Sequence, residues 1–404
     1  MDPLDILTNL DQVIPYYQAI FSADAHKIIG YEVLGRFQTE DKAESLGPFF
    51  HDDAIPDEYR IEVDQVVLAK ALDYIIEEED KTSLIFINQN TNLLMKDHGE
   101  SLLALLRSFE ERGLSLSQIV LEITEHDFNG DIDQLDHLLT YYRTYGIKIA
   151  IDNIGKESSN LDRIGLLSPD ILKIDLHILR KTAMTQSYQD VLYSLALLAR
   201  KIGATLLYED IEASFQLQYA WRNGGRYFQG FYLHKPSPAF VPADLLKDKL
   251  KEQFRSFIAQ EKKKLLAIHN LTQCFQVKLQ QLIPKCKKLT SYDEMIAVMA
   301  RELSDVCFRI YICDENGFQQ SANILKKEES WNFEPRYVNK NWSWRPYFLE
   351  NIIRMSHEQK GILSDLYSDI ESGESIRTFS YPIDSHHYVF IDLPYSFLYE
   401  RDAL

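Results

Sequence analysis

The most regular alternation of hydrophobic and polar positions lies in the middle of the chain, over residues 147–155. Ile147, Ile149 and Ile151 fall at every second position, which predicts a β-strand with one buried face. The apolar run then stops at a carboxylate, Asp152, which is followed by an amide and a glycine turn. We therefore predict a strand whose carboxyl end carries polar side chains.

The same arrangement recurs along the chain. The polar residues at the ends of these short apolar segments are Asn88, Glu122, Asp152, Lys173, Asp175, Glu209 and Gln229. Segments with helical spacing lie near or between them, over residues 59–79, 100–112, 132–145, 188–202 and 212–222. This alternation is typical of an α/β fold of the TIM-like (β/α)8 barrel type, in which catalytic groups lie at the carboxyl ends of the strands. One polar strand end can simply mark where solvent begins, but recurrence on so many strands favours a site.

Two further strands are predicted near the amino terminus, over residues 13–21 and 31–37. In the second strand a period of two places Glu32, Leu34 and Arg36 on one face. A Glu–Arg cross-strand pair at a sheet edge explains this pattern as well as a ligand site does. The alternation alone leaves both interpretations open.

The chain is longer than one barrel requires. A TIM-like barrel takes about 250 residues, and this chain has 404, so a second domain of about 150 residues is expected. We place the barrel at residues 1–241, a helical linker at 242–288 and a C-terminal α+β domain at 289–404. The linker is one long helix or two, and its apolar spacing over residues 245–282 predicts packing against a domain or a second subunit.

The C-terminal segment is predicted to combine helices with an antiparallel sheet. A helix over residues 292–303 precedes a hairpin of residues 308–313 and 318–323, turned at Glu315-Asn316-Gly317. An aromatic helix follows, and further strands are predicted near residues 361–367, 376–383 and 388–393.

Net charge and hydropathy narrow the range of possible ligands and cellular locations. A net charge of −18 argues against general binding to DNA or RNA, which relies on a positive protein surface. A small nucleotide remains compatible with an acidic site if divalent cations lie between the two. No apolar run approaches the roughly 20 residues of a membrane helix, and the amino terminus lacks the features of a signal peptide. We therefore expect a cytoplasmic protein with no membrane insertion, whose four cysteines are reduced and mostly buried.

The polar strand ends contain an all-oxygen set of side chains: Glu32, Asn88, Glu122 and Asp152. Oxygen ligands suit Mg²⁺, Mn²⁺ or Ca²⁺ and do not suit zinc. Lys173 can neutralise a phosphate or orient a water molecule, and Glu209 can accept a proton from water. These residue types fit the metal-assisted hydrolysis of a phosphodiester.

Six short motifs occur in a fixed order. They are Tyr17-Gln18-Ala19-Ile20, Glu32-Val33-Leu34-Gly35-Arg36, Leu121-Glu122-Ile123-Thr124-Glu125, Leu172-Lys173-Ile174-Asp175, Tyr208-Glu209-Asp210-Ile211-Glu212 and Gln229-Gly230-Phe231. In this order they resemble the bacterial EAL family of cyclic di-GMP phosphodiesterases, whose signature reads Glu-Ala-Leu-x-Arg. The resemblance extends from about residue 13 to residue 236.

The resemblance implies a barrel whose first strand runs antiparallel to the others. It also implies a homodimer that binds cyclic di-GMP together with Mg²⁺ or Mn²⁺. The metal ligands it implies are Glu32, Asn88, Glu122 and Asp152, with Asn153 at the second metal. The residues it assigns to the attacking water are Lys173 and Glu209. The residues it assigns to the nucleotide are Gln18, Leu34, Arg36, Asp175 and Gln229, and Glu125 is expected to brace the loop after the central strand.

The central stretch departs from the family pattern. Active members read Asp-Asp-Phe-Gly-Thr-Gly, whereas this chain reads Asp152-Asn153-Ile154-Gly155-Lys156-Glu157. Asn153 is neutral, so it is a weaker ligand for a divalent cation than a carboxylate, and Glu157 restricts a position that glycine leaves free. Loss of one of two ions should slow hydrolysis more than it weakens binding. We therefore expect a cyclic di-GMP-binding protein with weak or absent hydrolysis; the alternative is an active phosphodiesterase that produces pGpG under control of the C-terminal domain.

Three C-terminal segments resemble parts of PAS or Cache sensor domains. They are Trp342-Ser343-Trp344-Arg345-Pro346-Tyr347, Ser364-Asp365-Leu366-Tyr367 and Phe390-Ile391-Asp392. In such domains an Arg, a Tyr and an Asp often line a pocket for a small ligand. An alternative is that the aromatic residues form a core and that Arg345 forms a surface ion pair.

Overall fold

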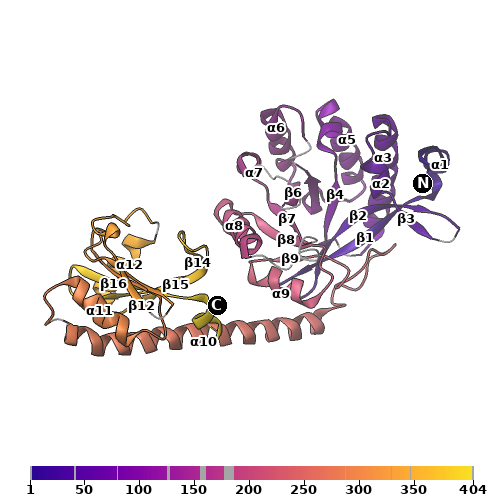
Figure 1. The fold of residues 1–404 in the computed structure, drawn as a ribbon. Helices are drawn as coiled ribbons and strands as arrows, with labels where there is room; N and C mark the ends of the chain where they lie inside the picture. Colours follow the sequence, from indigo (N-terminus) through magenta and orange to yellow (C-terminus); the bar gives the residue numbers. More distant parts are fainter. Residues whose placement is uncertain are drawn as a thin grey trace. The chain divides into compact units, whose positions relative to one another are not determined.

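The computed structural model of the chain describes residues 2–40, 42–79, 81–124, 128–154, 161–176, 186–286, 288–328, 330–345 and 347–402. The chain forms two compact units, Met1–Arg255 and Ser256–Leu404, which appear in Figure 1 as the indigo-to-magenta and the orange-to-yellow parts. The separate C-terminal domain that the chain length predicts is therefore present.

The first unit contains a closed barrel. Its strands are β1 (Val13–Ser22), β2 (Ile28–Gln38), β4 (Leu84–Asn88), β5 (Ile119–Ile123), β6 (Lys148–Ile154), β7 (Ile171–Asp175), β8 (Thr205–Glu209) and β9 (Tyr227–Phe228). In the order β2-β4-β5-β6-β7-β8-β9, each strand pairs in parallel with the next. Strand β1 pairs antiparallel with both β2 and β9 and so closes the ring. A short extra strand, β3 (Ala43–Ser45), pairs antiparallel with β2. The predicted TIM-like barrel with one antiparallel strand is confirmed.

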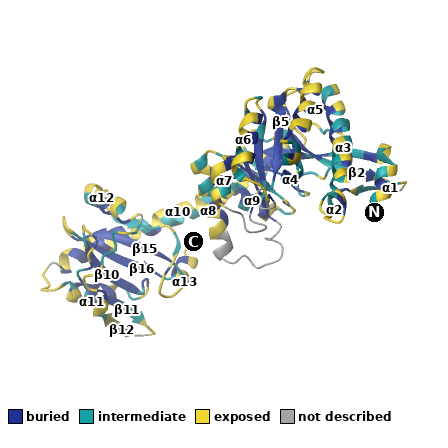
Figure 2. Ribbon diagram, turned by 90° about the horizontal axis from the view of Figure 1, so that it is seen from above, coloured by how far each residue is buried: buried dark blue, intermediate teal, exposed yellow. Residues whose placement is uncertain are grey.

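Helices surround the barrel, as Figures 1 and 2 show. They are α1 (Pro3–Thr8), α2 (Gly47–Phe50), α3 (Asp57–Glu77), α4 (Thr91–Leu94), α5 (Glu100–Glu110), α6 (Ile132–Arg143), α7 (Leu161–Leu167), α8 (Gln186–Ile202) and α9 (Ser214–Arg222). Strands β4, β5 and β7 lie where the polar strand ends at Asn88, Glu122 and Asp175 predict them. The last barrel strand is shorter than predicted because Gln229 leaves the ladder: its carbonyl accepts from the amide of Ile211 at 3.1 Å, and Gly230 follows with φ +149.

The second unit is built on an antiparallel sheet whose strand order is β12-β11-β10-β16-β15-β13, with β14 paired to β15. The strands are β10 (Arg309–Asp314), β11 (Asn323–Lys327), β12 (Ser330–Glu334), β13 (Ile362–Leu363), β14 (Tyr367–Ser368), β15 (Ser375–Pro382) and β16 (His387–Leu393). The helices are α11 (Tyr292–Glu302), α12 (Phe348–Glu358), α13 (Tyr395–Tyr399) and most of α10 (Lys247–Cys286), whose first residues belong to the first unit. The segment proposed as a linker is thus one continuous helix over most of its length, and not two.

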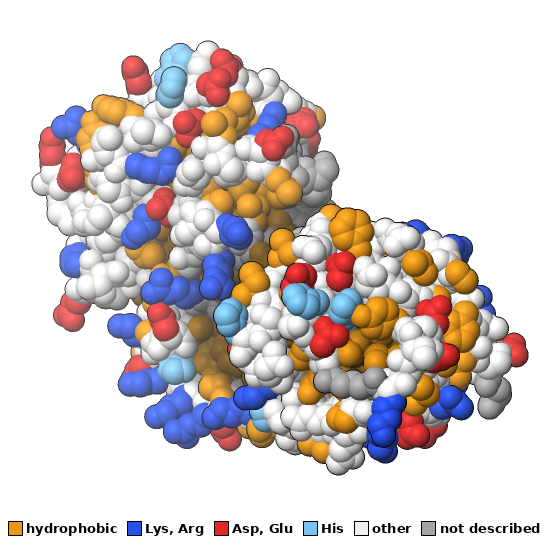
Figure 3. Space-filling model, turned by 90° about the vertical axis from the view of Figure 1, so that its left-hand side faces the viewer, with side chains coloured by type: hydrophobic (Ala, Val, Ile, Leu, Met, Phe, Trp, Pro, Cys, Tyr) orange, Lys and Arg blue, Asp and Glu red, His pale blue; other side chains and the backbone are white. Residues whose placement is uncertain are grey.

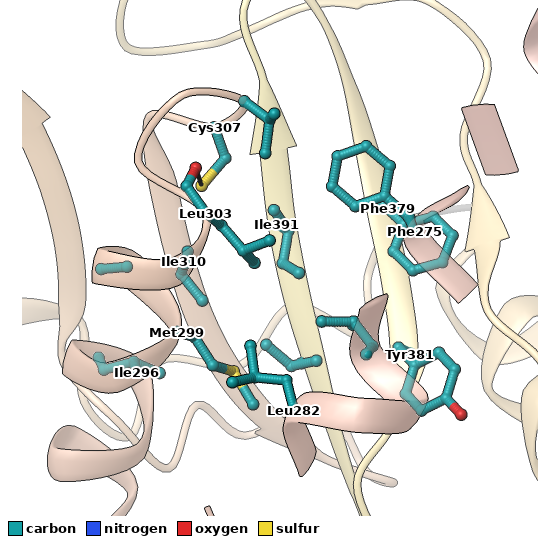
Figure 4. Close-up of a cluster of buried hydrophobic side chains, with 14 of the residues drawn as sticks. Phe275, Leu282, Ile296, Met299, Leu303, Cys307, Ile310, Phe379, Tyr381 and Ile391 are labelled. Carbon is teal, nitrogen blue, oxygen red and sulfur yellow. Dashed lines mark hydrogen bonds between the residues drawn. The ribbon is translucent and has the colours of Figure 1, made fainter. Parts of the chain in front are cut away.

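The core of the second unit forms where α10 and α11 cover one face of the sheet. Phe275 and Leu282 of α10 lie beside Met299 of α11 and beside Phe379 and Ile391 of the sheet (Figure 4). Each of these side chains is at most 6% exposed. Burial of this apolar surface explains why the second half of α10 packs as a helix whose outer face is mostly polar.

The predicted hairpin of residues 308–323 is formed only in part: next to the turn, Cys313 and Gln319 form an isolated antiparallel bridge, and the amide of Gln320 donates to the Ile312 carbonyl at 2.8 Å. The turn forms as expected, with Gly317 at φ +87, but the strand that pairs with β10 begins at Asn323, so that Arg309 lies opposite Leu325. Polar side chains interrupt the ladder between the turn and this strand. The Ser321 hydroxyl accepts from the amide of Ile312 at 2.9 Å and takes the place of a backbone carbonyl.

The surface is mixed in character, and the cysteines are unpaired thiols. On the face that Figure 3 shows, acidic, basic and hydrophobic side chains are interspersed. Among the described residues, no helix has both the length and the hydrophobicity needed to cross a membrane. All four cysteines are free, and three of them are buried.

Close packing between β2 and β4 provides a test of the barrel. A Cβ atom at Gly30 would lie 2.9 Å from the Cβ of Leu84 and would overlap its carbonyl oxygen. We expect Gly30→Ala to lower the free energy of unfolding by about 1–3 kcal/mol. The matched control is Gly165→Ala in α7, where nothing lies within 4 Å and where alanine should stabilise the helix by up to about 1 kcal/mol. Urea unfolding of both variants measures this, and equal effects would contradict the packing.

Candidate functional site

The period of a β-strand places the polar strand ends inside the barrel. A layer of buried side chains fills the interior and includes Phe86, Val120, Ala150, Ile171 and Leu207. Residues two positions apart on a strand point to the same side. The residues two positions further along these five strands are Asn88, Glu122, Asp152, Lys173 and Glu209. The predicted site residues therefore form the next layer, at the carboxyl ends of the strands.

Lys173 lies at the centre of this layer. Its side chain is 1% exposed, although lysine is rarely buried without partners. The ammonium nitrogen lies 3.4 Å from Glu32 Oε2, 2.9 Å from Glu122 Oε1, 3.2 Å from Asp152 Oδ1 and 3.3 Å from Glu209 Oε2. One buried cation thus contacts four carboxylates from four different strands.

Three amide side chains donate hydrogen bonds to carboxylates of this cluster. Asn88 Nδ2 donates to Glu32 Oε1 at 2.7 Å, and Gln229 Nε2 donates to Glu32 Oε2 at 2.7 Å. Asn153 Nδ2 donates to Asp152 Oδ2 at 2.9 Å. Both oxygens of Glu32 therefore have partners, as does one oxygen of Asp152.

Other carboxylate oxygens are left short of partners. Among the described residues, Lys173 Nζ is the only partner of Glu122 Oε1, at 2.9 Å, and of Asp152 Oδ1, at 3.2 Å, and Glu122 Oε2 has no hydrogen-bond partner. Buried polar atoms without hydrogen bonds are rare and mark sites where a ligand or an ion is missing. The donor set, which is all oxygen and mostly anionic, suits a hard divalent cation.

The pKa values of the buried groups also indicate an excess of negative charge in this cluster. Burial, followed by the charge of Glu32, raises the pKa of Glu122 well above its usual value. Burial, followed by the charge of Asp152, does the same to the pKa of Glu209. Burial alone would lower the pKa of Lys173, but the surrounding carboxylates raise it well above the usual value, so the ammonium stays charged. A single positive charge leaves this set of carboxylates under-compensated.

The carboxylates converge on the Lys173 ammonium and not on an open point between them. Within the described ranges, no three acidic, histidine or cysteine side chains surround a common position for a metal ion. Any ion at these strand ends must therefore lie beside Lys173 and share the carboxylates with it.

The predicted nucleotide contacts lie around this cluster. Gln18 on β1 is opposite Glu32 on β2, and Asp175 is opposite Glu209. Leu34 is half-buried further along β2. Arg36, also on β2, has a Nη1 atom that donates to the Gly35 carbonyl at 3.0 Å and to the Ser45 hydroxyl at 3.1 Å.

Arg36 has no carboxylate within ion-pair distance among the described residues. Its guanidinium lies 5.7 Å from the ring centre of Tyr16, and partial burial lowers its pKa. A half-buried guanidinium without an anionic partner beside an acidic cluster is a suitable contact for a phosphate.

Comparison with known proteins agrees with this geometry. Residues 4–236 match the family model of the EAL domain. The chain belongs to the EAL-domain family. Residues 240–404 match a second family, described as an EAL-domain associated signalling protein domain. The similarity of the C-terminal unit to PAS or Cache domains stays a prediction.

One EAL-domain relative matches the whole chain. The YkuI protein of Bacillus subtilis, described as an uncharacterised EAL-domain protein, is 60% identical over the full length of both chains. Its crystal structure, with substrate c-di-GMP and calcium, has a TM-score of 0.95 and covers 100% of both chains.

More distant EAL-domain relatives match in part. BlrP1 of Klebsiella pneumoniae, in a calcium and cyclic di-GMP complex, is 25% identical with a TM-score of 0.51, and the match covers 57% of this chain and 58% of that one. The cyclic di-GMP phosphodiesterase NbdA of Pseudomonas aeruginosa is 26% identical over 140 residues, which are 35% of this chain and 18% of NbdA.

Some EAL-domain predictions cannot be placed. Glu125, Lys156 and Glu157 lie outside the residues that the structure describes. Asn153 is described and has φ +60, a left-handed conformation that asparagine tolerates better than most residues.

One supporting residue escaped the sequence analysis. Asp64 lies on α3, between the buried residues Val63 and Val67, and its Oδ2 atom accepts from Gln89 Nε2 at 2.8 Å, directly after Asn88. Burial raises the pKa of Asp64 to about 6. A charged residue among apolar neighbours was the available signal, but helical spacing alone could not show which strand end it contacts.

The under-compensated carboxylates predict that divalent cations stabilise this EAL domain. We expect millimolar CaCl₂ or MgCl₂ to raise the melting temperature by several degrees over an EDTA-treated sample, because an ion that binds only the folded state stabilises it. Glu122→Gln should lose most of this increase. In EDTA the same variant should be at least as stable as the wild type, because burial and the neighbouring carboxylates raise the pKa of Glu122 and so make its charge unfavourable in the folded state.

The matched control for Glu122→Gln is Asp73→Asn. Asp73 is an exposed acid that pairs with Arg112 at 2.6 Å outside the barrel. Its response to cations should equal that of the wild type in differential scanning fluorimetry. An unchanged cation response in Glu122→Gln would exclude Glu122 as a ligand.

Proposed function

We propose that this EAL-domain protein binds cyclic di-GMP at the carboxyl ends of the barrel strands, together with a divalent cation, and hydrolyses it weakly or not at all. The observation that carries the proposal is the set of carboxylates of which Lys173 compensates only a part. It is supported by the 60% identical YkuI protein, whose structure contains c-di-GMP and calcium.

The residues that would hold the cation are Glu32, Asn88, Glu122 and Asp152. The amide oxygen of Asn88 is available because its nitrogen already donates to Glu32. A divalent cation bound there would neutralise phosphate charge and lower the pKa of a water molecule in its shell. We expect Mg²⁺ in the cell; the related structures contain calcium or manganese.

The nucleotide would be held by groups at the rim of the same cluster. Arg36 supplies a guanidinium without a carboxylate partner, and its fork geometry suits a phosphate. Gln18, Leu34 and Gln229 lie on β1, β2 and after β9, and would contact the rest of the ligand. Asp175 lies beside Glu209 and would support the same surface.

Weak hydrolysis follows from Asn153. Its side-chain nitrogen donates to Asp152, so at this position the chain places a neutral donor where active family members have a carboxylate. An aspartate there would add an anionic ligand for a second ion. Two ions act together in such sites, so the neutral residue should reduce turnover more than affinity.

The second candidate function is an active phosphodiesterase. Lys173 and Glu209, which would orient and deprotonate the attacking water, are both present and lie 3.3 Å apart. Under this alternative the protein produces pGpG, and the C-terminal unit controls the rate. Because these two groups are in place, catalysis depends on whether a second cation binds.

Binding is tested by isothermal titration calorimetry of the full chain with cyclic di-GMP in CaCl₂. We expect saturable heat, and at least about tenfold weaker binding for Glu32→Ala and Asp152→Ala, because each removes a cation ligand. Asp73→Asn is again the control. Absence of heat at high micromolar nucleotide would contradict the proposal.

Hydrolysis is tested by chromatographic detection of pGpG. We expect slow or undetectable turnover by the wild type in millimolar Mg²⁺. Turnover should rise by about tenfold or more in Asn153→Asp, which restores the anionic ligand. Adding Lys156→Thr and Glu157→Gly should raise it further. Rapid hydrolysis by the wild type would favour the second candidate, and silence of all variants would favour a pure receptor.

We also infer that the protein is a homodimer. Four large apolar side chains on α10 are exposed in the single chain: Ile258 (41%), Leu265 (63%), Leu266 (60%) and Val277 (51%). A second copy would cover them. Light scattering at micromolar concentration should give twice the mass of the chain, and Leu265→Glu with Leu266→Glu should shift it toward the monomer; a monomeric wild type would contradict this.

A further inference from the structure

Two strands of the barrel have no helix of their own. In a (β/α)8 barrel each strand is normally followed by a helix of the outer ring. Here β1 leads into β2 through a turn, and the next helix after β9 is α10. The segment that leaves the barrel lies against these strands. We call residues 237–254 the α10 root; they comprise an irregular stretch and the beginning of α10, and they belong to the first unit.

The α10 root is fastened to β1 and β2 by hydrogen bonds. The amide of Tyr17 on β1 donates to the Ser237 carbonyl at 2.7 Å, and the amide of Ser237 donates to the Tyr17 carbonyl at 3.0 Å. The hydroxyl of Tyr31 on β2 donates to the Val241 carbonyl at 2.8 Å and accepts from the Val241 amide at 3.3 Å. Two neighbouring strands therefore hold the same short segment.

An aromatic cluster adds to these hydrogen bonds. The ring of Phe240 stacks on that of Tyr31 with 3.8 Å between ring centres. It also lies edge-on to Tyr17 at 5.0 Å and to Tyr74 of α3 at 5.3 Å. The amide of Phe240 donates to the Tyr74 hydroxyl at 3.0 Å. Aromatic pairs in these geometries are favourable beyond the area that they bury, so Phe240 joins the α10 root to β1, β2 and α3 at once.

The helical part of the α10 root contacts the last barrel strand. Phe254 is buried, and its ring centre lies 5.9 Å from that of Phe228 on β9. Lys249 Nζ lies 4.3 Å from the ring centre of Tyr232, and Gln253 donates to the hydroxyl of the same tyrosine. Since β1 pairs with both β2 and β9, the root contacts three strands that are neighbours in the ring.

Each of these outer contacts lies one residue before a predicted site residue. The pairs of outer and inner residues are Tyr17 and Gln18, Tyr31 and Glu32, and Phe228 and Gln229. Successive residues of a strand point to opposite faces, so one member of each pair faces the α10 root and the other faces the site. Inside the barrel, Gln18 lies opposite Glu32, and Gln229 Nε2 donates to Glu32 Oε2 at 2.7 Å. A shift of the root that moves these strands would therefore move the site residues with them.

We propose that the α10 root regulates the nucleotide site by positioning Gln18, Glu32 and Gln229 from the outer side of the barrel. The inference rests on the proposed function, because it concerns the same site. Coupling between two binding or conformational events is reciprocal, so bound cation and nucleotide stabilise the root, and a loosened root weakens binding. Helix α10 continues into the second unit, so a displacement of this helix would reach the site through Phe240 and Phe254.

The variant Tyr31→Phe separates the fastening of the root from the packing of the core. It removes the hydroxyl that binds Val241 and keeps the ring that stacks on Phe240. We expect Tyr31→Phe and Phe240→Leu to weaken cyclic di-GMP binding by about fivefold or more in calorimetry of the full chain with CaCl₂.

The matched control is Tyr142→Phe. Tyr142 is a buried tyrosine of α6 whose hydroxyl donates to the Gly99 carbonyl at 2.6 Å. Its replacement removes the same kind of hydrogen bond, so it should lower the melting temperature about as much as Tyr31→Phe does. The Kd for the nucleotide should stay at the wild-type value, because Tyr142 does not contact the α10 root.

Hydrogen–deuterium exchange tests the coupling in the reverse direction. Cyclic di-GMP with CaCl₂ should slow amide exchange over residues 237–254 by about threefold or more. The effect should be larger than in α6, which leads into β6, the strand opposite β1 in the ring. In Tyr31→Phe, saturating nucleotide should give much less protection of the root.

Failure of this inference can be distinguished from failure of the proposed function. If the wild type binds the nucleotide, the inference is overturned by a wild-type Kd in Tyr31→Phe, by an equal loss of affinity in Tyr142→Phe, or by equal protection of the root and α6. If the wild type binds no nucleotide, the proposed function fails. Exchange in CaCl₂ alone then decides the inference, because Glu32 is a proposed cation ligand, and an unprotected root would overturn it. If Phe240→Leu fails to fold, Tyr31→Phe decides.

Discussion

The barrel site depends on one buried ammonium group. Lys173 is held by carboxylates from four strands, and they keep it charged in surroundings that would otherwise favour its neutral form. The same carboxylates outnumber it: among the described residues, Lys173 is the only partner of Glu122 Oε1 and of Asp152 Oδ1, and Glu122 Oε2 has no hydrogen-bond partner. In our proposal, the affinity for a divalent cation, and through it for a phosphodiester, arises from this imbalance.

Much of the barrel could be predicted because a β-strand repeats every two residues. The apolar residue that fills the interior and the polar residue at the strand end lie on the same face, as with Val120 and Glu122. Reading the strand ends therefore identified residues that the structure brings together. The position of Lys173 at the centre of the cluster could not be predicted, since it depends on the stagger between neighbouring strands.

The C-terminal unit was harder to predict for a related reason. Arg309 is paired with Asp369 and Asp392, which are 60 and 83 residues away in the sequence, so nothing local distinguished it from a surface arginine. Arg345 was singled out from its aromatic surroundings, but only the structure shows that it lacks a carboxylate while Arg309 has several. The hairpin error arose because the Ser321 side chain replaces a backbone acceptor, which hydrophobic alternation does not reveal.

The central claim is that the strand-end carboxylates hold a divalent cation beside Lys173. The most direct measurement is anomalous diffraction from crystals grown with MnCl₂ and cyclic di-GMP. We expect an anomalous peak at about 2.0–2.6 Å from oxygens of Glu32, Asn88, Glu122 and Asp152, with Lys173 still in contact with the cluster. Bound nucleotide without an anomalous peak among these four residues would contradict the claim.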